Sequence, residues 1–429
     1  MNEIAPDSLA LEADYAPIDS LVDEHANEAA FLWLQRTSAV HAPNYGTQQF
    51  ADLDEGLAAH LDGLRVAGAK GWEQAATLLD NEGAEDFFVA AVLAIKSADL
   101  RFDDLVERAK DLPEVVPGLI SALGWVEPHH LGGCVKALLD DASPLRRKLG
   151  IAACALHRRD PGSVLDALIS GVPDSVRIRA MRAAGELGRI DLLPQLRAAL
   201  GEAKPELRFW AAWSAVLLGD RTQGLDALAA FALKAGPRQP RAFQFALQAL
   251  DVAAGHALLL DSAVLPDALR LRIQGAGFIG DVRYVPWLIE QMAQPAVARI
   301  AGEAFATITG ADFNLEQMEV PPPDDFEDGP TEDPDDENVE PPEDIALPWP
   351  DVAVIQRWWQ ANQSCFVAGT RSFMGQPVSR AACIGVLRGG FQRQRVAAAL
   401  HLALQEPPAP LFATAAPAWR QQRALAALG

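Results

Sequence analysis

The chain has little cysteine, little tyrosine and no long apolar run. Of its 429 residues, three are tyrosines and four are cysteines, namely Cys134, Cys154, Cys365 and Cys383. No two cysteines form a C-x-x-C pair, so their spacing matches neither a zinc site nor a disulfide framework, and we interpret them as core thiols in a reducing compartment. No uncharged apolar run reaches the roughly 18 residues of a membrane-spanning helix, and the acidic N-terminus lacks the features of a signal peptide. We therefore expect a cytoplasmic protein with no membrane partner.

Positive charge is also scarce. The formal net charge is −22, and thirteen of the carboxylates lie between Glu319 and Asp344, a stretch without lysine or arginine. Strong negative charge repels phosphate backbones, so we do not expect nucleic acid as a partner.

An internal repeat is the dominant pattern of the chain. The segments 143–160, 174–191 and 205–222 align when they are anchored on Leu145, Val176 and Leu207, which are 31 residues apart. Weaker copies continue the frame at 85–100, 113–128, 239–256, 267–284 and 295–312. A period near 30 residues that is sustained over about eight units predicts a repeat architecture.

Each repeat follows the same order of residue types. A Pro, Asp or Ser opens a helix, an Arg follows near its first turn, and Leu or Ile before Gly closes most units, as at Gly188, Gly219 and Gly280. Glycine at that place can adopt the left-handed conformation that ends a helix. Shorter apolar helices fill the spaces between, so each unit predicts a helical hairpin. The pattern over residues 85–312 resembles the short HEAT-like repeats first recognised in phycobilin lyases.

We predict an all-α fold with four parts. An N-terminal helical cap (1–84) precedes an α-solenoid of about eight HEAT-like helical-hairpin repeats (85–318). An acidic, proline-rich disordered linker (319–350) leads to a small, arginine-rich helical C-terminal segment (351–429). The linker is interpreted as a solvated spacer, or alternatively as an electrostatic clamp that folds back on the basic C-terminal segment or on the solenoid.

One arginine recurs near the start of the repeats. These repeat arginines are Arg146, Arg177, Arg208, Arg241 and Arg270. They could form a basic column that grips an acidic ligand. We favour the alternative that they stack successive repeats by pairing with nearby acids or carbonyls, since one arginine at a fixed place in each unit is what stacking requires.

The chain offers little catalytic or metal-binding chemistry. It has no G-x-S-x-G, P-loop or G-x-G-x-x-G motif, and no His-Glu dipeptide of the kind that HEAT-like di-iron hydroxylases use. His129, His130 and Cys134 could supply three metal ligands, but a Gly-Gly pair intervenes and an ordinary loop is the favoured interpretation. We expect no catalytic residues, no metal and no cofactor, and hence no enzyme.

Candidate contacts with a partner lie toward the C-terminus. Tryptophans near the linker and arginines of the C-terminal segment are residue types that anchor protein interfaces. The predicted partner-binding residues are Trp349, Trp358, Trp359, Arg371, Arg393 and Arg395. For tryptophans on repeat helices, core packing is the alternative.

Both ends of the chain carry a second resemblance. The segments LDEGLAAHLDGLRVAG (53–68), RSFMGQPVS (371–379) and GFQRQRVAAALHLALQEPPAPLFATAAPAWRQQ (390–422) are similar to a proteobacterial family with N-terminal helices, HEAT-like repeats and this tail. Genes of that family often lie close to type VI secretion genes. The resemblance implies a setting and makes a type VI secretion effector or component the favoured partner. The predicted solenoid, with its long concave surface, favours a non-catalytic protein-binding scaffold, adaptor or chaperone. The alternatives are an immunity protein that masks a toxin, and a HEAT-like lyase or metal-dependent modifying enzyme. The sequence leaves the oligomeric state open.

Overall fold

The computed structural model describes residues 17–98, 100–171, 173–266, 268–323, 326 and 341–429. Within this part of the chain the structure consists of α-helices with four two-residue strands, which confirms the predicted all-α solenoid. The chain divides into two compact units, Met1–Leu34 with Glu55–Ala122, and Gln35–Asp54 with Leu123–Gly429. Each unit is described by itself, and the boundaries fall within α1, α2 and α6.

The first unit contains the predicted N-terminal cap without its residues 35–54, together with the earliest repeat. It holds α3 (Ala69–Leu78), α4 (Ala84–Ser97) and α5 (Arg101–Arg108), and parts of α1 (Asp19–Ala39), α2 (Thr47–Val66) and α6 (Val116–Trp125). Helix α4 is buried over most of its length because nearly all of its residues are apolar. Trp33 stacks on Phe88 with ring centroids 5.5 Å apart and donates its Nε1–H to Ser121 Oγ at 2.8 Å. The cap residues 1–16 lie outside the described residues.

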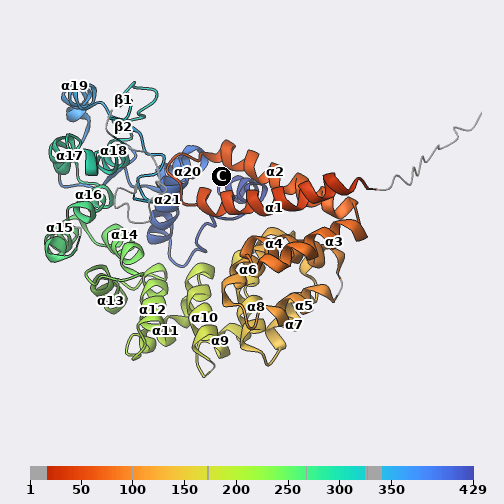
Figure 1. Cartoon of the computed structure of the whole chain (residues 1–429). Helices are drawn as coiled ribbons and strands as arrows, with labels where there is room; N and C mark the ends of the chain where they lie inside the picture. Colours follow the sequence, from red (N-terminus) through yellow and green to blue (C-terminus); the bar gives the residue numbers. More distant parts are fainter. Residues whose placement is uncertain (1–16, 99, 172, 267, 324–325, 327–340) are drawn as a thin grey trace, which may run out of the picture. The chain divides into compact units, whose positions relative to one another are not determined.

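Successive helix pairs form most of the second unit. They are α7 (Cys134–Asp140), α8 (Pro144–Leu156), α9 (Ser163–Leu168), α10 (Asp174–Leu187), α11 (Leu193–Ala199), α12 (Pro205–Leu217), α13 (Gln223–Ala232), α14 (Gln239–Ala249), α15 (Val252–Asp261), α16 (Ala268–Ile279), α17 (Val285–Gln291) and α18 (Pro295–Thr309). In Figure 1, the first helices of the pairs, α8 to α18 in even numbers, form an inner row, and α9 to α17 in odd numbers form an outer row.

Short 3₁₀ helices join several of these elements. They are η1 (Leu79–Asn81), η2 (Pro113–Val115), η3 (Pro128–Leu131), η4 (Ile190–Leu192), η5 (Ser262–Val264), η6 (Val282–Tyr284) and η7 (Gln363–Cys365). Proline at the first turn starts α8, α12 and α18, where its missing N–H leaves no hydrogen bond unmade. Small residues let the inner helices approach closely: a Cβ at Gly185 of α10 would lie 2.8 Å from Ser214 Cα of α12. The predicted repeat period is thus the period of the helix pairs.

The C-terminal segment belongs to the same unit as the repeats. Its elements are α19 (Val352–Asn362), β3 (Ser372–Phe373), β4 (Gln376–Pro377), α20 (Arg380–Gly389), α21 (Gln392–Gln405) and α22 (Ala418–Ala427). Strands β3 and β4 form an antiparallel pair, and α21 packs against α12 and α14 of the inner row. The inner row is therefore covered in part by the chain itself.

The structure differs from the predicted disordered linker at both of its ends. Residues 324–325 and 327–340 lie outside the described residues, but β1 (Glu319–Val320) and β2 (Trp349–Pro350) pair antiparallel. Asp344 is 2% exposed and accepts a hydrogen bond from Arg270, with Arg299 beside it. A backbone pairing and a buried carboxylate between arginines order these ends, although the composition of the whole segment opposes a packed structure.

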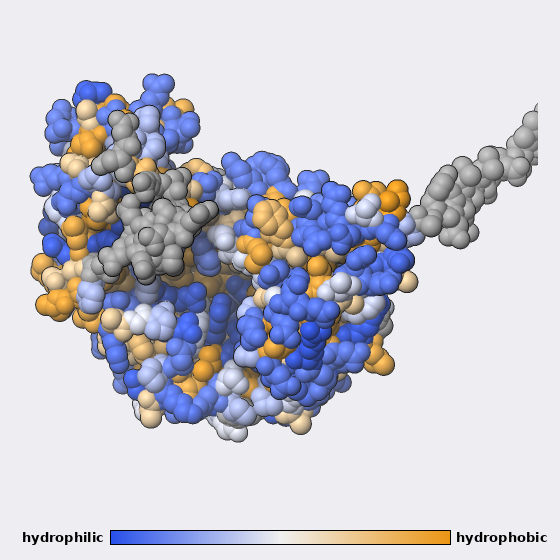
Figure 2. All heavy atoms as spheres, in the orientation of Figure 1, coloured by the Kyte–Doolittle hydropathy of each residue, from blue (hydrophilic) through white to orange (hydrophobic). Residues whose placement is uncertain are grey.

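The exposed surface is largely hydrophilic, with isolated apolar spots. Figure 2 shows one such spot at the left. Leu260 of α15 and Val264 of η5 are 69% and 90% exposed. Single exposed apolar residues are normal on protein surfaces. No helix among the described residues combines the length and the apolar character that crossing a membrane requires.

Candidate functional site

Arg371 joins the C-terminal ends of two inner helices. Its guanidinium donates to the carbonyl of Ile279 at the end of α16 (3.0 Å) and to three carbonyls at the end of α14. These three belong to Leu247 (2.7 Å), Gln248 and Leu250 (2.8 Å). The last carbonyls of a helix have no partner within the helix, and a cation there also interacts favourably with the helix dipole. Burial lowers the pKa of Arg371 to about 10, which leaves it charged at neutral pH.

The residues after Arg371 continue this pattern. Ser372 donates its N–H to the Gly280 carbonyl (2.8 Å) and its hydroxyl to the Ile308 carbonyl near the end of α18 (2.7 Å). Met374 donates its N–H to the carbonyl of Thr307 at 2.7 Å. The RSFMGQPVS segment is therefore held on the ends of α14, α16 and α18.

The chain after α21 forms hydrogen bonds with the ends of further helices. The N–H of Leu411 donates to the Glu186 carbonyl at the end of α10 (3.1 Å), and Arg158 donates to the Leu411 carbonyl (2.7 Å). Arg420 donates to the Gly124 carbonyl at the end of α6 at 2.7 Å. We call residues 371–428 the capping tail, because this stretch supplies partners to the ends of inner helices along the row.

The glycines that end the repeats make room for the capping tail. Gly188 and Gly280 have φ of 73° and 74°, which confirms the predicted left-handed conformation. A Cβ at Gly280 would lie 2.2 Å from the Ser372 carbonyl oxygen, and one at Gly188 would lie 1.9 Å from that of Pro408. Glycine is needed here both for its backbone angle and for the closeness of the tail.

Two of the predicted partner-binding arginines have internal contacts. Arg395 is 1% exposed and donates to the Leu387 carbonyl (2.8 Å) and to the side chains of Gln392 and Gln421. Arg371 binds the helix ends described above. The structure thus gives both guanidinium groups a role inside the chain, and partner binding through them stays a prediction.

The predicted tryptophans lie in two places. Trp349 of β2 lies against Arg299, whose guanidinium carbon is 4.8 Å from the ring centroid. Trp358 of α19 packs edge-on against Phe305 of α18 at 5.7 Å, and Trp359 packs against Phe366 at 5.6 Å. These rings pack against neighbouring side chains, as the core alternative expects, and their part in partner binding is untested.

The repeat arginines make contacts of the kind that stacking requires. Arg177 pairs with Glu202, Arg146 lies 3.7 Å from Asp141, and the guanidinium of Arg208 donates to the Glu202 carbonyl at 2.9 Å. Arg270 likewise donates to the Ala296 carbonyl (2.9 Å) and to Asp344. Arg241 differs, because its guanidinium lies 5.4 Å from the centroid of the Trp210 ring.

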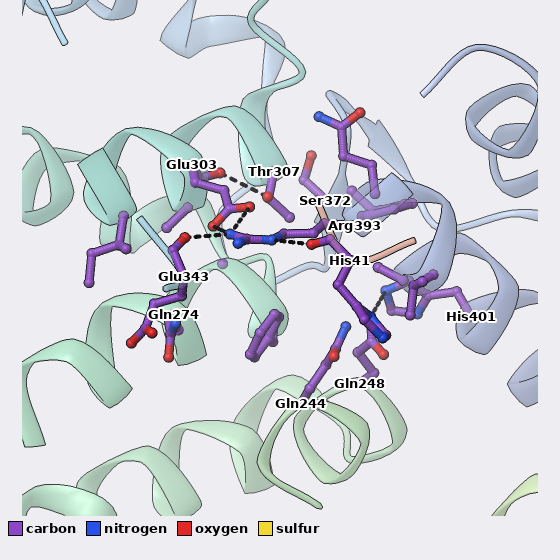
Figure 3. Close-up of a pocket in the computed structure, with 18 residues that line it drawn as sticks. His41, Gln244, Gln248, Gln274, Glu303, Thr307, Glu343, Ser372, Arg393 and His401 are labelled. Atoms are coloured by element: carbon purple, nitrogen blue, oxygen red, sulfur yellow. Dashed lines mark hydrogen bonds and ion pairs between the residues drawn. The ribbon is translucent and has the colours of Figure 1, made fainter. Parts of the chain in front are cut away.

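A cavity of about 310 Å³, whose mainly apolar wall carries several polar groups, lies between the inner row and the capping tail (Figure 3). Arg393 of α21 crosses it, donating to the His41 carbonyl (2.8 Å), to the Glu343 carbonyl (2.8 Å) and to the Glu303 carboxylate (3.1 Å). The remaining polar lining comes from Gln244, Gln248, Gln274, Thr307, Ser372, Gln394 and His401. Arg393 was predicted to bind a partner, and here it holds together three segments of its own chain.

The cavity combines the Arg393–Glu303 ion pair with uncharged hydrogen-bonding groups. His401 lies 3.3 Å from Gln248 Nε2, and burial followed by the charge of Arg371 lowers the pKa of His401 to about 3, so it is uncharged at neutral pH. Gln248 Oε1 is buried without a hydrogen-bond partner among the described residues. Burial raises the pKa of Glu303, while Arg393 opposes that rise.

Metal ligands do not converge in the described part of the chain. It contains no group of three His, Cys, Asp or Glu residues that could hold a metal ion. The rings of His129 and His130 lie 4.0 Å apart on η3, next to Cys134 at the start of α7.

The fold defines the class of the protein as a helical-repeat scaffold, an α-solenoid of HEAT-like helix pairs. Residues 161–248, which run from α9 to α14, match the family of HEAT repeats. Among solved structures, the chain is similar to the X-ray structure of YibA from E. coli at 13% identity and a TM-score of 0.32, with 71% of this chain and 97% of that chain covered. A comparison with curated proteins finds no match.

Proposed function

We propose that the protein is a non-catalytic scaffold that binds another protein as an adaptor or chaperone. The observation that carries this proposal is the row of HEAT-like helix pairs from α7 to α18, since HEAT repeats commonly mediate protein–protein interaction. The resemblance of both chain ends to a family encoded near type VI secretion genes favours an effector or a secretion component as the partner.

The capping tail changes which surface is available to that partner. A helical solenoid usually offers its inner face to an extended ligand. In this chain α21 already packs on α12 and α14, so the partner binds beside the tail. We propose that the tail is an integral part of the scaffold.

Affinity purification of the tagged full-length chain from its native host, with mass spectrometry of the eluate, tests this function. We expect one secretion component or effector at near-equal stoichiometry, above the level found with an untagged host. A chain that elutes alone under conditions in which secretion is active contradicts the scaffold. Metal analysis and an absorbance scan of the same sample test the alternative of an enzyme, which predicts a bound metal or chromophore.

A further inference from the structure

Cations gather on the inner row around a single buried tryptophan. Trp210 of α12 is 3% exposed, and the guanidinium carbons of Arg182, Arg238 and Arg241 lie 4.9, 5.2 and 5.4 Å from its ring centroid. We define the basic cluster as these three arginines together with Arg179 of α10 and Lys148 of α8.

Acidic groups balance only part of the basic cluster. Glu186 pairs with both Arg179 (2.9 Å) and Arg182 (2.8 Å), and Glu206 pairs with Arg238 (2.7 Å). Among the residues that the structure describes, Lys148 and Arg241 make no salt bridge with a carboxylate, and only the more distant charge of Glu186 acts on Arg241. The cluster therefore carries five cations against two carboxylates, in a chain whose net charge is −22.

The cations disfavour one another's charge. Enclosure lowers the pKa of Lys148, and the neighbouring charge of Arg179 adds to this effect. Desolvation of part of its side chain, and then the charges of Arg182 and Arg238, lower the pKa of Arg241 to about 10, while the charge of Glu186 opposes that shift. An anion placed among these groups would relieve the repulsion, and guanidinium groups bind carboxylates with two parallel hydrogen bonds.

The cluster remains open to solvent. The side chains of Arg182 and Arg238 are 41% and 36% exposed, and Arg241 is exposed as well. Arg241 precedes Gln244 and Gln248 on one face of α14, and these two glutamines line the cavity of Figure 3, so the cluster lies next to that cavity.

The dimensions fit an extended peptide. The cluster runs from α8 to α14 across three helix-to-helix steps of about 8–10 Å each. An extended chain advances roughly 3.3 Å per residue, so about eight residues would span it. A long nucleic acid fits less well, because the chain is strongly acidic outside the cluster. The Trp210 ring is also buried under arginines and offers no face for base stacking.

We propose that the basic cluster is the docking site for a short acidic segment of a protein partner, held extended across α8 to α14. This proposal rests on the proposed scaffold function and names the chemistry of its partner.

A fluorescein-labelled decaglutamate peptide, titrated with the full chain and followed by anisotropy, tests the site directly. We expect saturable binding that weakens when the salt concentration rises from about 50 to about 150 mM, because salt screens the attraction between exposed charges. The affinity for decaglutamate should fall about tenfold in Arg241→Glu, which reverses a contacting charge, and about threefold in Arg241→Gln, which removes it. Arg357→Glu is the matched control, since Arg357 is an exposed arginine of α19 and the substitution changes the net charge by the same amount. The affinity of this variant for decaglutamate should stay within about twofold of wild type.

Three results would overturn the proposal. The first is the absence of decaglutamate binding at a protein concentration of about 1 mM, which would detect even weak affinity. The second is an equal loss of affinity in Arg241→Glu and Arg357→Glu. The third is that a ten-residue oligo-dT competes for the site as well as unlabelled decaglutamate does. Capture from the host separates this site from the scaffold function. If Arg241→Glu captures the wild-type partner undiminished, the site is wrong and the scaffold stands. If wild type captures nothing but binds decaglutamate through Arg241, the site stands and the scaffold function is wrong.

Discussion

Replacing Arg371 tests the central role of the capping tail. Arg371→Ala removes a cation that bonds four carbonyls at the ends of α14 and α16. Hydrogen bonds to a charged group contribute about 1.5–3 kcal/mol each, and buried acceptors left unpaired cost about 1–3 kcal/mol each. The bonds act as a unit and the burial of the charge offsets part of their sum, so we expect a net loss of about 3 kcal/mol in the free energy of unfolding.

The substitution should also have a local effect. The amides of Ser372 and Met374 donate to Gly280 and Thr307 across the same junction. Their hydrogen exchange should therefore accelerate in Arg371→Ala by more than that of amides within α12. Arg371→Lys should recover only part of the stability, because an ammonium group cannot fork between two helix ends.

Urea unfolding and hydrogen exchange of the two variants, with Arg357→Ala as the control, measure these effects. Arg357 is exposed on α19, so its loss should change stability by less than about 0.5 kcal/mol. The reasoning is refuted if the free energy of unfolding of Arg371→Ala lies within ~1 kcal/mol of wild type, which is the contribution of one ordinary hydrogen bond, and if its tail amides exchange at the wild-type rate. Arg371 would then be a surface residue in effect, available to a partner.

Three further substitutions probe other parts of the fold. Gly280→Ala should destabilise by more than about 2 kcal/mol and release the tail to protease, whereas Gly385→Ala, in an open helical position, should be neutral or slightly stabilising; equal thermal midpoints would contradict this. The pKa of His401 is about 3 in the folded chain and about 6.5 in the unfolded chain, so protonation of the unfolded state lowers the free energy of unfolding as pH falls below 6.5. Between pH 6 and 5 the free energy of unfolding of wild type should therefore fall by up to ~1.4 kcal/mol more than that of His401→Phe, and parallel pH profiles of the two proteins would exclude this role. Asp344→Asn should cost about 2–3 kcal/mol in urea unfolding because Arg299, 6% exposed, loses its neighbouring carboxylate; an unchanged midpoint would count against the pairing.

The repeat could be predicted from the sequence because its signals are local and recur. The anchors Val176 and Leu207 are fully buried, and the Gly188 and Gly280 conformations follow from the need to end a helix within each unit. A period of 31 residues then requires only that neighbouring units stack.

The capping tail could not be predicted in the same way. Its acceptors are backbone carbonyls, which every residue carries, so the sequence contains no partner motif that would mark them. One signal was present: residues 351–429 hold eight arginines and only Asp351 and Glu406 as acids. An arginine-rich segment with so few acids, next to a row of helices that each end in unpaired carbonyls, is itself a reason to expect capping. The paired ends of the acidic segment were missed because strands of two residues leave no alternating pattern to detect.

The pairing of β1 with β2 brings the two ends of the acidic segment together at one point of the fold. Glu319 lies opposite Pro350, and the amide of Asp351 donates to the Met318 carbonyl at 2.7 Å, so the chain re-enters beside its exit. The distance between α18 and α19 is then independent of how many residues lie between the strands. Closing such a loop costs only about 0.6 kcal/mol more for each doubling of its length. The number of residues between Phe326 and Pro341 can therefore change over evolutionary time, or increase by an inserted epitope in the laboratory, while the paired strands, the buried Asp344, the repeats and the tail keep their places.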